Sequence, residues 1–405
     1  MDKQNLGNMI KKLRLKASLT QAELAFKLNI SDKTISKWES GLGYPDITQL
    51  PALSEIFGVS IDYLLKGNSK GITIAGNIIV DIVNTIDKYP KQSMLANVLE
   101  TEKAVGGCVS NTIIDISKID PEVLLFAIGK IGDDENGRFV SSQIKQYGID
   151  TSGIIVSDKY STSCTNVMYD ISTSERTFFY SKGANQDFSI SDINIDKLDC
   201  EFFHIGYVFL LDALDADDEE YGTKLARLLH MVNSKGIKTS IDAISSDQEG
   251  YSKKTIPVLK YCNYTIMNEI ESGLVTGINP RKDDGSIDVE KIRIILNKFI
   301  DYGVQEKAIV HSKEAGFMMT ADREFIVVPS FNIPNEYIKG NLGAGDAFTA
   351  GCLYGLYSGY SDKEILEFAS CAAAANLSAP DSISGMKSKD KLKAIENQFT
   401  RRELL

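Results

Sequence analysis

Apolar residues recur at helical spacing through the first 66 residues of the chain. Positions three and four apart fall on one face of a helix, so this pattern predicts short helices that pack along their apolar faces. The first candidate core positions are Leu6, Met9, Ile10, Leu13, Leu24, Ala25, Leu28, Ile35 and Trp38. The later ones are Leu50, Leu53, Ile56, Ile61, Leu64 and Leu65. We therefore expect a small all-α bundle of five helices.

Local signals mark where two of these helices begin. Thr20 and Ser31 stand at expected N-cap positions, where a side-chain oxygen accepts a bond from a free amide of the first turn. Glu23 follows Thr20 at the spacing of a capping box. Asn29 lies between the two helices and tolerates the left-handed backbone of a tight turn. The second helix is expected to face outward with Asp32, Lys33, Thr34, Ser36 and Lys37.

The pattern changes from Ile72 onward. Short runs of β-branched residues alternate with helical stretches, which is typical of βα units around a parallel sheet. The expected strands are residues 72–74, 78–80, 123–128, 202–208, 238–242, 264–267 and 308–311. The expected helices include residues 219–235 and 289–301. We predict an all-α domain over residues 1–66, a polar linker over 67–71 and an α/β domain over 72–398.

One stretch of the large domain, residues 153–182, lacks this alternation. Residues 164–170 and 176–180 read as strands with no helix between them. We interpret the stretch as part of a small antiparallel lid. A closing lid would exclude water from a reaction centre.

Charge is unevenly distributed along the chain. The net charge of all 405 residues is -11, but the first 68 residues hold nine Lys and Arg against seven Asp and Glu. Only these first 68 residues therefore carry a net positive charge that favours contact with the phosphate backbone of a nucleic acid. The six cysteines form no C-x-x-C pair, and we find neither an apolar signal segment nor a membrane-length apolar run. We expect a cytoplasmic protein with reduced thiols and no membrane partner.

The strongest chemical signal is Gly343-Ala344-Gly345-Asp346, which stands directly before an apolar helical run. Glycines before a helix let a phosphate approach the free amides, and the helix dipole favours negative charge there. Asp346 is then placed to accept the proton of an attacking hydroxyl. The alternative is a loop whose glycines serve turn geometry and whose aspartate caps a helix.

Further motifs along residues 72–398 resemble those of the ribokinase-like, PfkB-type carbohydrate kinases. The opening stretch ends at Asp81, a glycine pair precedes Asn111, and a glycine-rich turn covers residues 129–137. Gly183-Ala184-Asn185 and Asn268-Glu269-Ile270-Glu271 follow in the family's order. The resemblance implies a central, mostly parallel sheet with flanking helices and a small β lid.

The resemblance also implies roles for individual residues. The acceptor sugar would be bound by Asp81, Gly106, Gly107, Asn111 and Asn185. ATP would be bound by Asn268, Glu271 and Gly316, with Mg²⁺ near Glu271 through water. Gly343, Ala344 and Gly345 would stabilise the transition state, and Asp346 would be the base.

Three positions depart from the family's pattern. Gly340-Asn341 stands where an Asp-Thr pair is usual, which puts a monovalent-cation site in doubt. Lys313 replaces a glycine of the nucleotide loop, so the nucleotide preference stays open. Cys108 stands where ribokinases have a sugar-contacting lysine, which weakens ribose as the substrate.

Residues 10–65 resemble the Cro/CI-type (XRE) helix-turn-helix family, most clearly at residues 20–25 and 36–41. The resemblance implies that Gln21 approaches a phosphate while Lys33, Thr34 and Lys37 face base edges of double-stranded DNA. Two half-sites one turn apart would call for a homodimer.

We expect an ATP- and Mg²⁺-dependent carbohydrate kinase whose front domain regulates transcription. Two alternatives stay open. The first is a sugar-sensing transcriptional regulator whose kinase domain is weak or inactive. The second is an active kinase whose front domain binds protein. The sequence names neither the sugar nor the operator.

Overall fold

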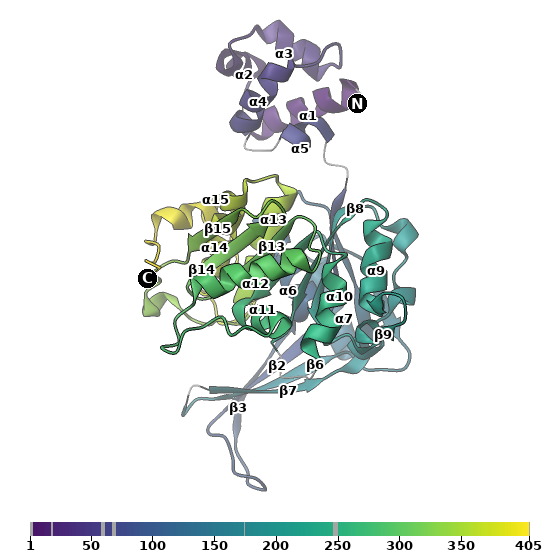
Figure 1. The fold of residues 1–405 in the computed structure, drawn as a ribbon, viewed down its shortest axis with the longest axis vertical. Coiled ribbons are helices and arrows are strands. Elements are labelled where there is room, and N and C mark those ends of the chain that lie inside the picture. Colours follow the sequence, from purple (N-terminus) through teal and green to yellow (C-terminus); the bar gives the residue numbers. More distant parts are fainter. Residues whose placement is uncertain are drawn as a thin grey trace. The chain divides into compact units, whose positions relative to one another are not determined.

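The structure, a computed structural model, describes residues 3–17, 19–57, 61–66, 70–173, 175–245 and 250–404. The chain separates into two compact units, one formed by the first 70 residues and one by nearly all of the rest. Residues 67–69 of the predicted linker lie outside the described residues. Figure 1 shows both units as ribbons coloured along the sequence.

The first unit contains the five predicted helices. They are α1 (Lys3–Lys16), α2 (Gln21–Leu28), α3 (Asp32–Glu39), α4 (Leu50–Phe57) and α5 (Ile61–Lys66). Leu24, Ile35 and Leu53 are fully buried in their common core, and Trp38 is 5% exposed. The helical spacing of apolar residues thus found most of the core, but Ile61 is 37% exposed, and Ile56 and Leu65 are only partly buried.

The predicted caps and turn of this unit are confirmed. The side chain of Thr20 accepts a hydrogen bond from the amide of Glu23. The side chain of Glu23 accepts a hydrogen bond from the amide of Thr20, which completes the capping box. Ser31 caps α3 through the amide of Thr34. Asn29 adopts the left-handed conformation at φ 55°.

The second unit is built on a nine-stranded sheet with the order β15-β14-β13-β12-β11-β8-β1-β4-β5. Its members are β1 (Gly71–Gly76), β4 (Leu125–Gly132), β5 (Asp150–Ser157), β8 (Cys200–Val208), β11 (Lys238–Ala243), β12 (Tyr264–Asn268), β13 (Lys307–His311), β14 (Ala315–Thr320) and β15 (Phe325–Pro329). The strands from β5 to β13 are parallel, whereas β14 and β15 are antiparallel additions at one edge.

Helices pack on both faces of this sheet (Figure 1). They are α6 (Gly107–Ile119), α7 (Glu135–Lys145), α8 (Asp212–Asp215), α9 (Lys224–Asn233), α10 (Tyr251–Leu259), α11 (Glu269–Thr276), α12 (Val289–Asp301), α13 (Ala344–Tyr357), α14 (Asp362–Asn376) and α15 (Lys389–Lys393). The predicted helix over residues 289–301 is confirmed. Among the described residues, no helix is both long and apolar enough to cross a membrane.

The lid differs from the prediction in its composition. It is a four-stranded sheet of β3 (Val98–Gly106), β2 (Ile79–Ile86), β6 (Cys164–Asp170) and β7 (Glu175–Ser181), in that order. The strand predicted at 78–80 belongs to this sheet, and residues 153–157 belong to the main sheet. Strands β2 and β6 are parallel, so the lid is mixed instead of antiparallel.

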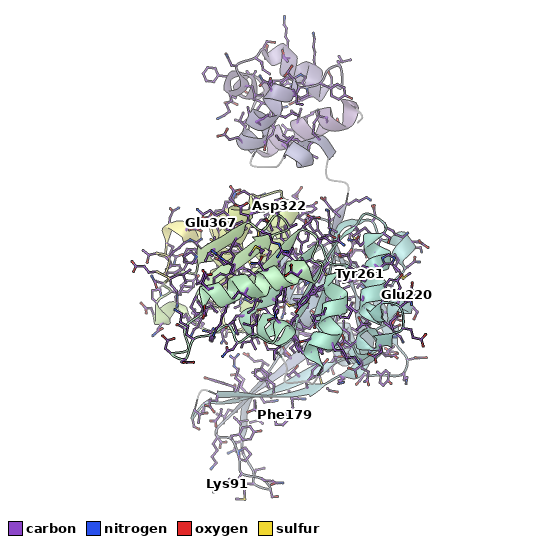
Figure 2. The ribbon with its side chains drawn as sticks, in the orientation of Figure 1. Lys91, Phe179, Glu220, Tyr261, Asp322 and Glu367 are labelled. Carbon is purple, nitrogen blue, oxygen red and sulfur yellow. The ribbon has the colours of Figure 1, made fainter. Side chains whose placement is uncertain are left out.

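Strand β3 was missed by sequence reasoning for a physical reason. Its first six residues are all exposed, so neither of its faces carries an apolar stripe. Residues such as Glu100 and Lys103 therefore hide the alternation that marks a strand. Figure 2 shows Lys91 at the far end of the β2–β3 connection and Phe179 on the lid.

Two further boundaries differ from the prediction. The helix expected from residue 219 begins only at Lys224, because β9 (Asp217–Asp218) and β10 (Gly222–Thr223) form a short hairpin first. The chain beyond residue 398 also packs on the second unit. The amide of Asn332 donates to the carbonyl of Thr400, and Arg401 lies over the ring of Phe331.

Candidate functional site

Asp346 lies in the first turn of α13, and its two carboxylate oxygens are bound from different elements. Asn111 of α6 donates from Nδ2 to Oδ2 at 2.8 Å. Tyr207 of β8 donates its hydroxyl to Oδ1 at 2.7 Å. Two donors therefore fix the orientation of a buried carboxylate at the start of a helix.

The environment of Asp346 tunes its protonation. Burial raises its pKa to about 6, and the negative charge of Asp242 adds to this shift. The hydrogen bonds from Tyr207 and Asn111 act in the opposite direction because they stabilise the ionised form. With this pKa the carboxylate is ionised in most molecules at pH 7 and can accept a proton.

The loop before α13 needs at least one glycine. Gly343 has φ +75°, and a Cβ there would lie 2.5 Å from the side chain of Ser382. Gly345 faces His311, whose ring would be 3.5 Å from an added Cβ. The helix starts at Ala344, so Asp346 lies in its first turn, where amides have no acceptor within the helix.

Asp81 lies on β2, and Gly106 makes room for it. A Cβ on Gly106 would lie 2.3 Å from Oδ2 of Asp81. Gly107 has φ +82°, and its Cβ would meet the carbonyl of Asn77 at 2.6 Å. Burial raises the pKa of Asp81 to about 6; a hydrogen bond with Thr165 lowers it, and the charge of Asp346 raises it.

Asn111 connects Asp346 to a loop near the C-terminus. Its Oδ1 accepts a bond from the hydroxyl of Ser382 at 2.8 Å, while its Nδ2 binds Asp346. Both ends of the amide are thus fixed. The structure therefore brings Asn111 and Asp346, both named as candidate site residues, into contact.

Asn185 has a different place from the one predicted. Its Oδ1 accepts the amide of Ile78 and its Nδ2 donates to the carbonyl of Ile78, each at 3.2 Å. Its backbone amide binds Ser163. The side chain is fully buried and holds the chain between β1 and β2, which places the lid strand that carries Asp81.

Asn268 and Glu271 form a closed capping box at the start of α11. The amide of Asn268 donates to Oε2 of Glu271 at 2.9 Å, and Nδ2 of Asn268 donates to Oε1 at 2.7 Å. Ser245 donates to the same Oε1 at 3.2 Å. Burial raises the pKa of Glu271 to about 8, and the charge of Asp242 contributes.

A pocket of about 380 Å³ opens beside the start of α13. Its polar lining includes Asn268, Glu269, Ser312, Lys313, Ser330, Asn341, Ser370 and Arg402. Its apolar lining includes Phe331, Ile333, Ile338, Phe348, Ala373, Ala374 and Leu377. Ala344 and Gly345 complete one wall, so the pocket reaches the helix terminus that carries Asp346.

Gly316 does not line this pocket. It lies on β14, and a Cβ there would meet the ring of Phe348 at 3.2 Å and Leu366 at 3.4 Å. Phe348 itself lines the pocket. Because Gly316 has no side chain, the ring of Phe348 can pack against β14.

Sequence reasoning missed Tyr207, Asp242 and Ser382. Asp242 lies near the carboxyl end of β11, a common place for functional side chains in α/β folds, and this could have identified it. Tyr207 contacts Asp346, and Ser382 contacts Asn111, only in the folded chain. No spacing signal marks either one.

In the first unit, α3 presents the predicted cationic residues to solvent. Lys33 and Lys37 are exposed, and the Thr34 hydroxyl lies 2.9 Å from that of Ser31. Gln21 instead donates to Glu39 at 2.8 Å. The side-chain amide of Gln21 is therefore hydrogen-bonded within the first unit.

Glu39 also receives the guanidinium of Arg14. Nε donates to Oε1 at 2.6 Å and Nη2 to Oε2 at 2.9 Å, with the side chains 9% and 4% exposed. This bidentate ion pair ties α1 to α3 across the core. The sequence analysis did not predict this ion pair.

Comparison with known proteins supports both units. A model described as pfkB family carbohydrate kinase matches residues 70–389, and a helix-turn-helix model matches residues 10–64. A 5-dehydro-2-deoxygluconokinase of Shouchella clausii is 24% identical over 315 residues, which cover 72% of this chain and 86% of the relative.

Solved structures show the same fold at low identity. The ribokinase of Arabidopsis thaliana, complexed with ribose and ATP, matches with a TM-score of 0.66 and 17% identity, covering 81% of this chain and 98% of that one. A putative ribokinase II of E. coli, in complex with ATP and Mg²⁺, matches with a TM-score of 0.62 and 18% identity, covering 81% and 99%.

Proposed function

Because the chain belongs to the pfkB family of carbohydrate kinases, we propose that it transfers the γ-phosphoryl group of ATP to a hydroxyl of a sugar or sugar-like acceptor. The observation that carries this proposal is the carboxylate of Asp346, held by Asn111 and Tyr207 at the start of α13 beside a pocket of about 380 Å³. The three side chains come from distant parts of the chain.

Asp346 acts as the general base in this proposal. It accepts the proton of the acceptor hydroxyl while that oxygen forms a bond to the γ-phosphorus and the bond to ADP breaks. Its pKa of about 6 suits the role, because the group is mostly ionised at neutral pH and still basic enough to take a proton.

The start of α13 stabilises the transferring group. Residues 343–346 supply helix-terminal amides, and hydrogen bonds to the charge of the transition state lower the barrier. The side of the pocket near Ala344 and Gly345 is therefore the place for the phosphates. The apolar walls that include Phe331 and Leu377 suit the base of the nucleotide.

Asp81 and Asn111 hold the acceptor. A carboxylate can accept bonds from two neighbouring hydroxyls, and Asp81 is supplied by the lid. Gly106 gives this carboxylate its space. The lid also covers the acceptor and keeps water away from the phosphoryl group.

The residues around Asn268 and Glu271 fit a Mg²⁺ ion held through water. Both oxygens of Glu271 already accept protein hydrogen bonds, so contact through ordered water suits this carboxylate better than direct ligation. Burial raises the pKa of Glu271 and the charge of Asp242 adds to this shift, so a nearby cation would favour the ionised carboxylate. Bound Mg²⁺ would neutralise phosphate charge, and it usually keeps several of its waters.

We propose further that the first unit binds double-stranded DNA through α3 and makes the kinase a cytoplasmic transcriptional regulator. Lys33 and Lys37 are exposed on the second helix of the motif, which enters the major groove in proteins of this kind. A homodimer would place two such helices on neighbouring half-sites.

The test of the kinase proposal is ADP release with a panel of acceptors that includes 5-dehydro-2-deoxygluconate, fructose and ribose. We expect turnover with at least one acceptor and none with D346N, while D346N still binds that acceptor. Acceptor binding without ADP release by the unmodified chain would instead favour a sugar sensor with an inactive kinase domain.

A further inference from the structure

Three side chains of metal-binding type converge behind the candidate active site. Cys108 comes from α6, His204 from β8 and Asp242 from β11, and their ligand atoms all lie within 4.8 Å of one another. Cys108 and His204 are completely buried, and Asp242 is 5% exposed. A thiolate, an imidazole and a carboxylate are the three ligand types that zinc uses in proteins.

The spacing of these atoms suits a single ion. Nε2 of His204 lies 3.3 Å from Oδ2 of Asp242. Nitrogen and oxygen ligands on a tetrahedral zinc are also about 3.3 Å apart, given bonds of roughly 2.0 to 2.1 Å. A Cβ on Gly206 would lie 2.0 Å from Oδ1 of Asp242 and 2.6 Å from Sγ of Cys108, so these two atoms meet beside one glycine.

Two independent features point to a ligand here. Oδ1 of Asp242 is buried and has no nitrogen or oxygen donor within the described part of the chain, while the thiol of Cys108 interacts with the same carboxylate. Such atoms are rare in folded proteins, and a bound cation would satisfy this one. In addition, Nδ1 of His204 lies 2.9 Å from the hydroxyl of Ser240, which fixes the ring and directs Nε2 toward Asp242 and Cys108.

We propose that Cys108, His204 and Asp242 bind one Zn²⁺ ion, with a water molecule as the fourth ligand. The thiol releases its proton to solvent when the ion binds, as metal-bound cysteines do. The ion would join α6, β8 and β11. Two of these elements carry Asn111 and Tyr207, so its role is to hold the supports of Asp346 in place.

This inference does not depend on the proposed reaction, and its readout is metal content. Full-length protein is incubated with Zn²⁺, desalted and analysed by mass spectrometry for bound metal. We expect one zinc ion per chain. Replacement by Co²⁺ should produce a thiolate-to-cobalt charge-transfer absorption, which reports on the cysteine directly.

C108A should lose both the zinc and the cobalt band. C262A is the matched control, because Cys262 is also a fully buried thiol but bonds to the carbonyl of Val258. It should keep both signals. If C108A does not fold by circular dichroism, C108S provides the test, with weaker zinc retention and no thiolate band.

Unmodified protein that retains no zinc and gives no cobalt band would overturn the proposal, as would equal binding by folded C108A. D346N should bind zinc normally. Failure of the proposed kinase function would therefore appear as missing ADP release with zinc present, whereas failure of the zinc site appears as missing metal alone.

Discussion

The hydroxyl of Tyr207 lies 2.7 Å from Oδ1 of Asp346, although 138 residues separate the two positions in the sequence. This bond does two things. It fixes the carboxylate that is proposed to accept the proton, and it lowers the pKa of that carboxylate against the effect of burial.

The first prediction concerns this bond. Y207F should reduce kcat roughly tenfold to hundredfold, because one hydrogen bond to a charged group contributes about 1.5 to 3 kcal/mol. The KM for ATP should change little, since Tyr207 does not line the nucleotide pocket. Steady-state kinetics measure both quantities, and Y302F serves as a control on another element. An unchanged kcat in Y207F would contradict the assigned positioning role.

The second prediction is the pH dependence of the reaction. Asp346 must be ionised to accept a proton, so turnover should fall as the pH drops through about 6. Y207F removes a bond that lowers the pKa of Asp346, so its acid limb should move to higher pH. A pH-rate profile of both proteins tests this. Identical acid limbs would mean that the limb reports another group.

The third prediction concerns Gly106. In G106A the new Cβ would lie 2.3 Å from Oδ2 of Asp81, so that carboxylate must move. The KM for the acceptor should rise at least tenfold while the KM for ATP stays unchanged. G43A is the control, because Gly43 does not have a positive φ and the nearest atom to its added Cβ among the described residues is a Trp38 ring carbon at 3.7 Å. A rise in both KM values would indicate a general loss of structure.

Motifs on single segments were the part of the site that the sequence could predict. Asp346 was singled out by the glycines before a helical run, and Asp81 and Asn111 were singled out by the resemblance to the family. Tyr207 and Ser382 were not found, because their contacts exist only in the folded chain. Buried strands such as β12 could be predicted from their apolar runs. The exposed strand β3 has no apolar pattern from which it could be predicted.

The fourth prediction concerns Asp115, a fully buried residue of α6. Both of its oxygens are without hydrogen-bond partners among the described residues, and burial raises its pKa well above the usual value. A carboxyl with a raised folded-state pKa binds its proton more tightly when folded. The stability of the chain therefore falls as the pH rises from the unfolded pKa of about 3.9 toward the folded one.

D115N cannot ionise, so it should unfold at a higher temperature than the unmodified chain at pH 8. The difference should shrink near pH 5. Thermal unfolding at the two pH values measures this, with the exposed substitution D133N as control. A D115N variant that is less stable at pH 8 would mean that the charged form of Asp115 has a stabilising partner.

The fifth prediction separates the two roles of the first unit's charged residues. Arg14 and Glu39 are buried as an ion pair, whereas Lys33 and Lys37 face solvent. R14M leaves the carboxylate of Glu39 without its guanidinium, and breaking a buried pair in this way costs about 3 to 5 kcal/mol. It should unfold the first unit and abolish DNA binding together. K33A/K37A should leave the unit folded and weaken DNA binding at every salt concentration, because both lysines lose their expected contacts with base edges in the major groove. Circular dichroism and fluorescence anisotropy at several salt concentrations distinguish the outcomes. Binding of K33A/K37A that matches the unmodified chain at every salt concentration would favour a protein partner for this unit over DNA.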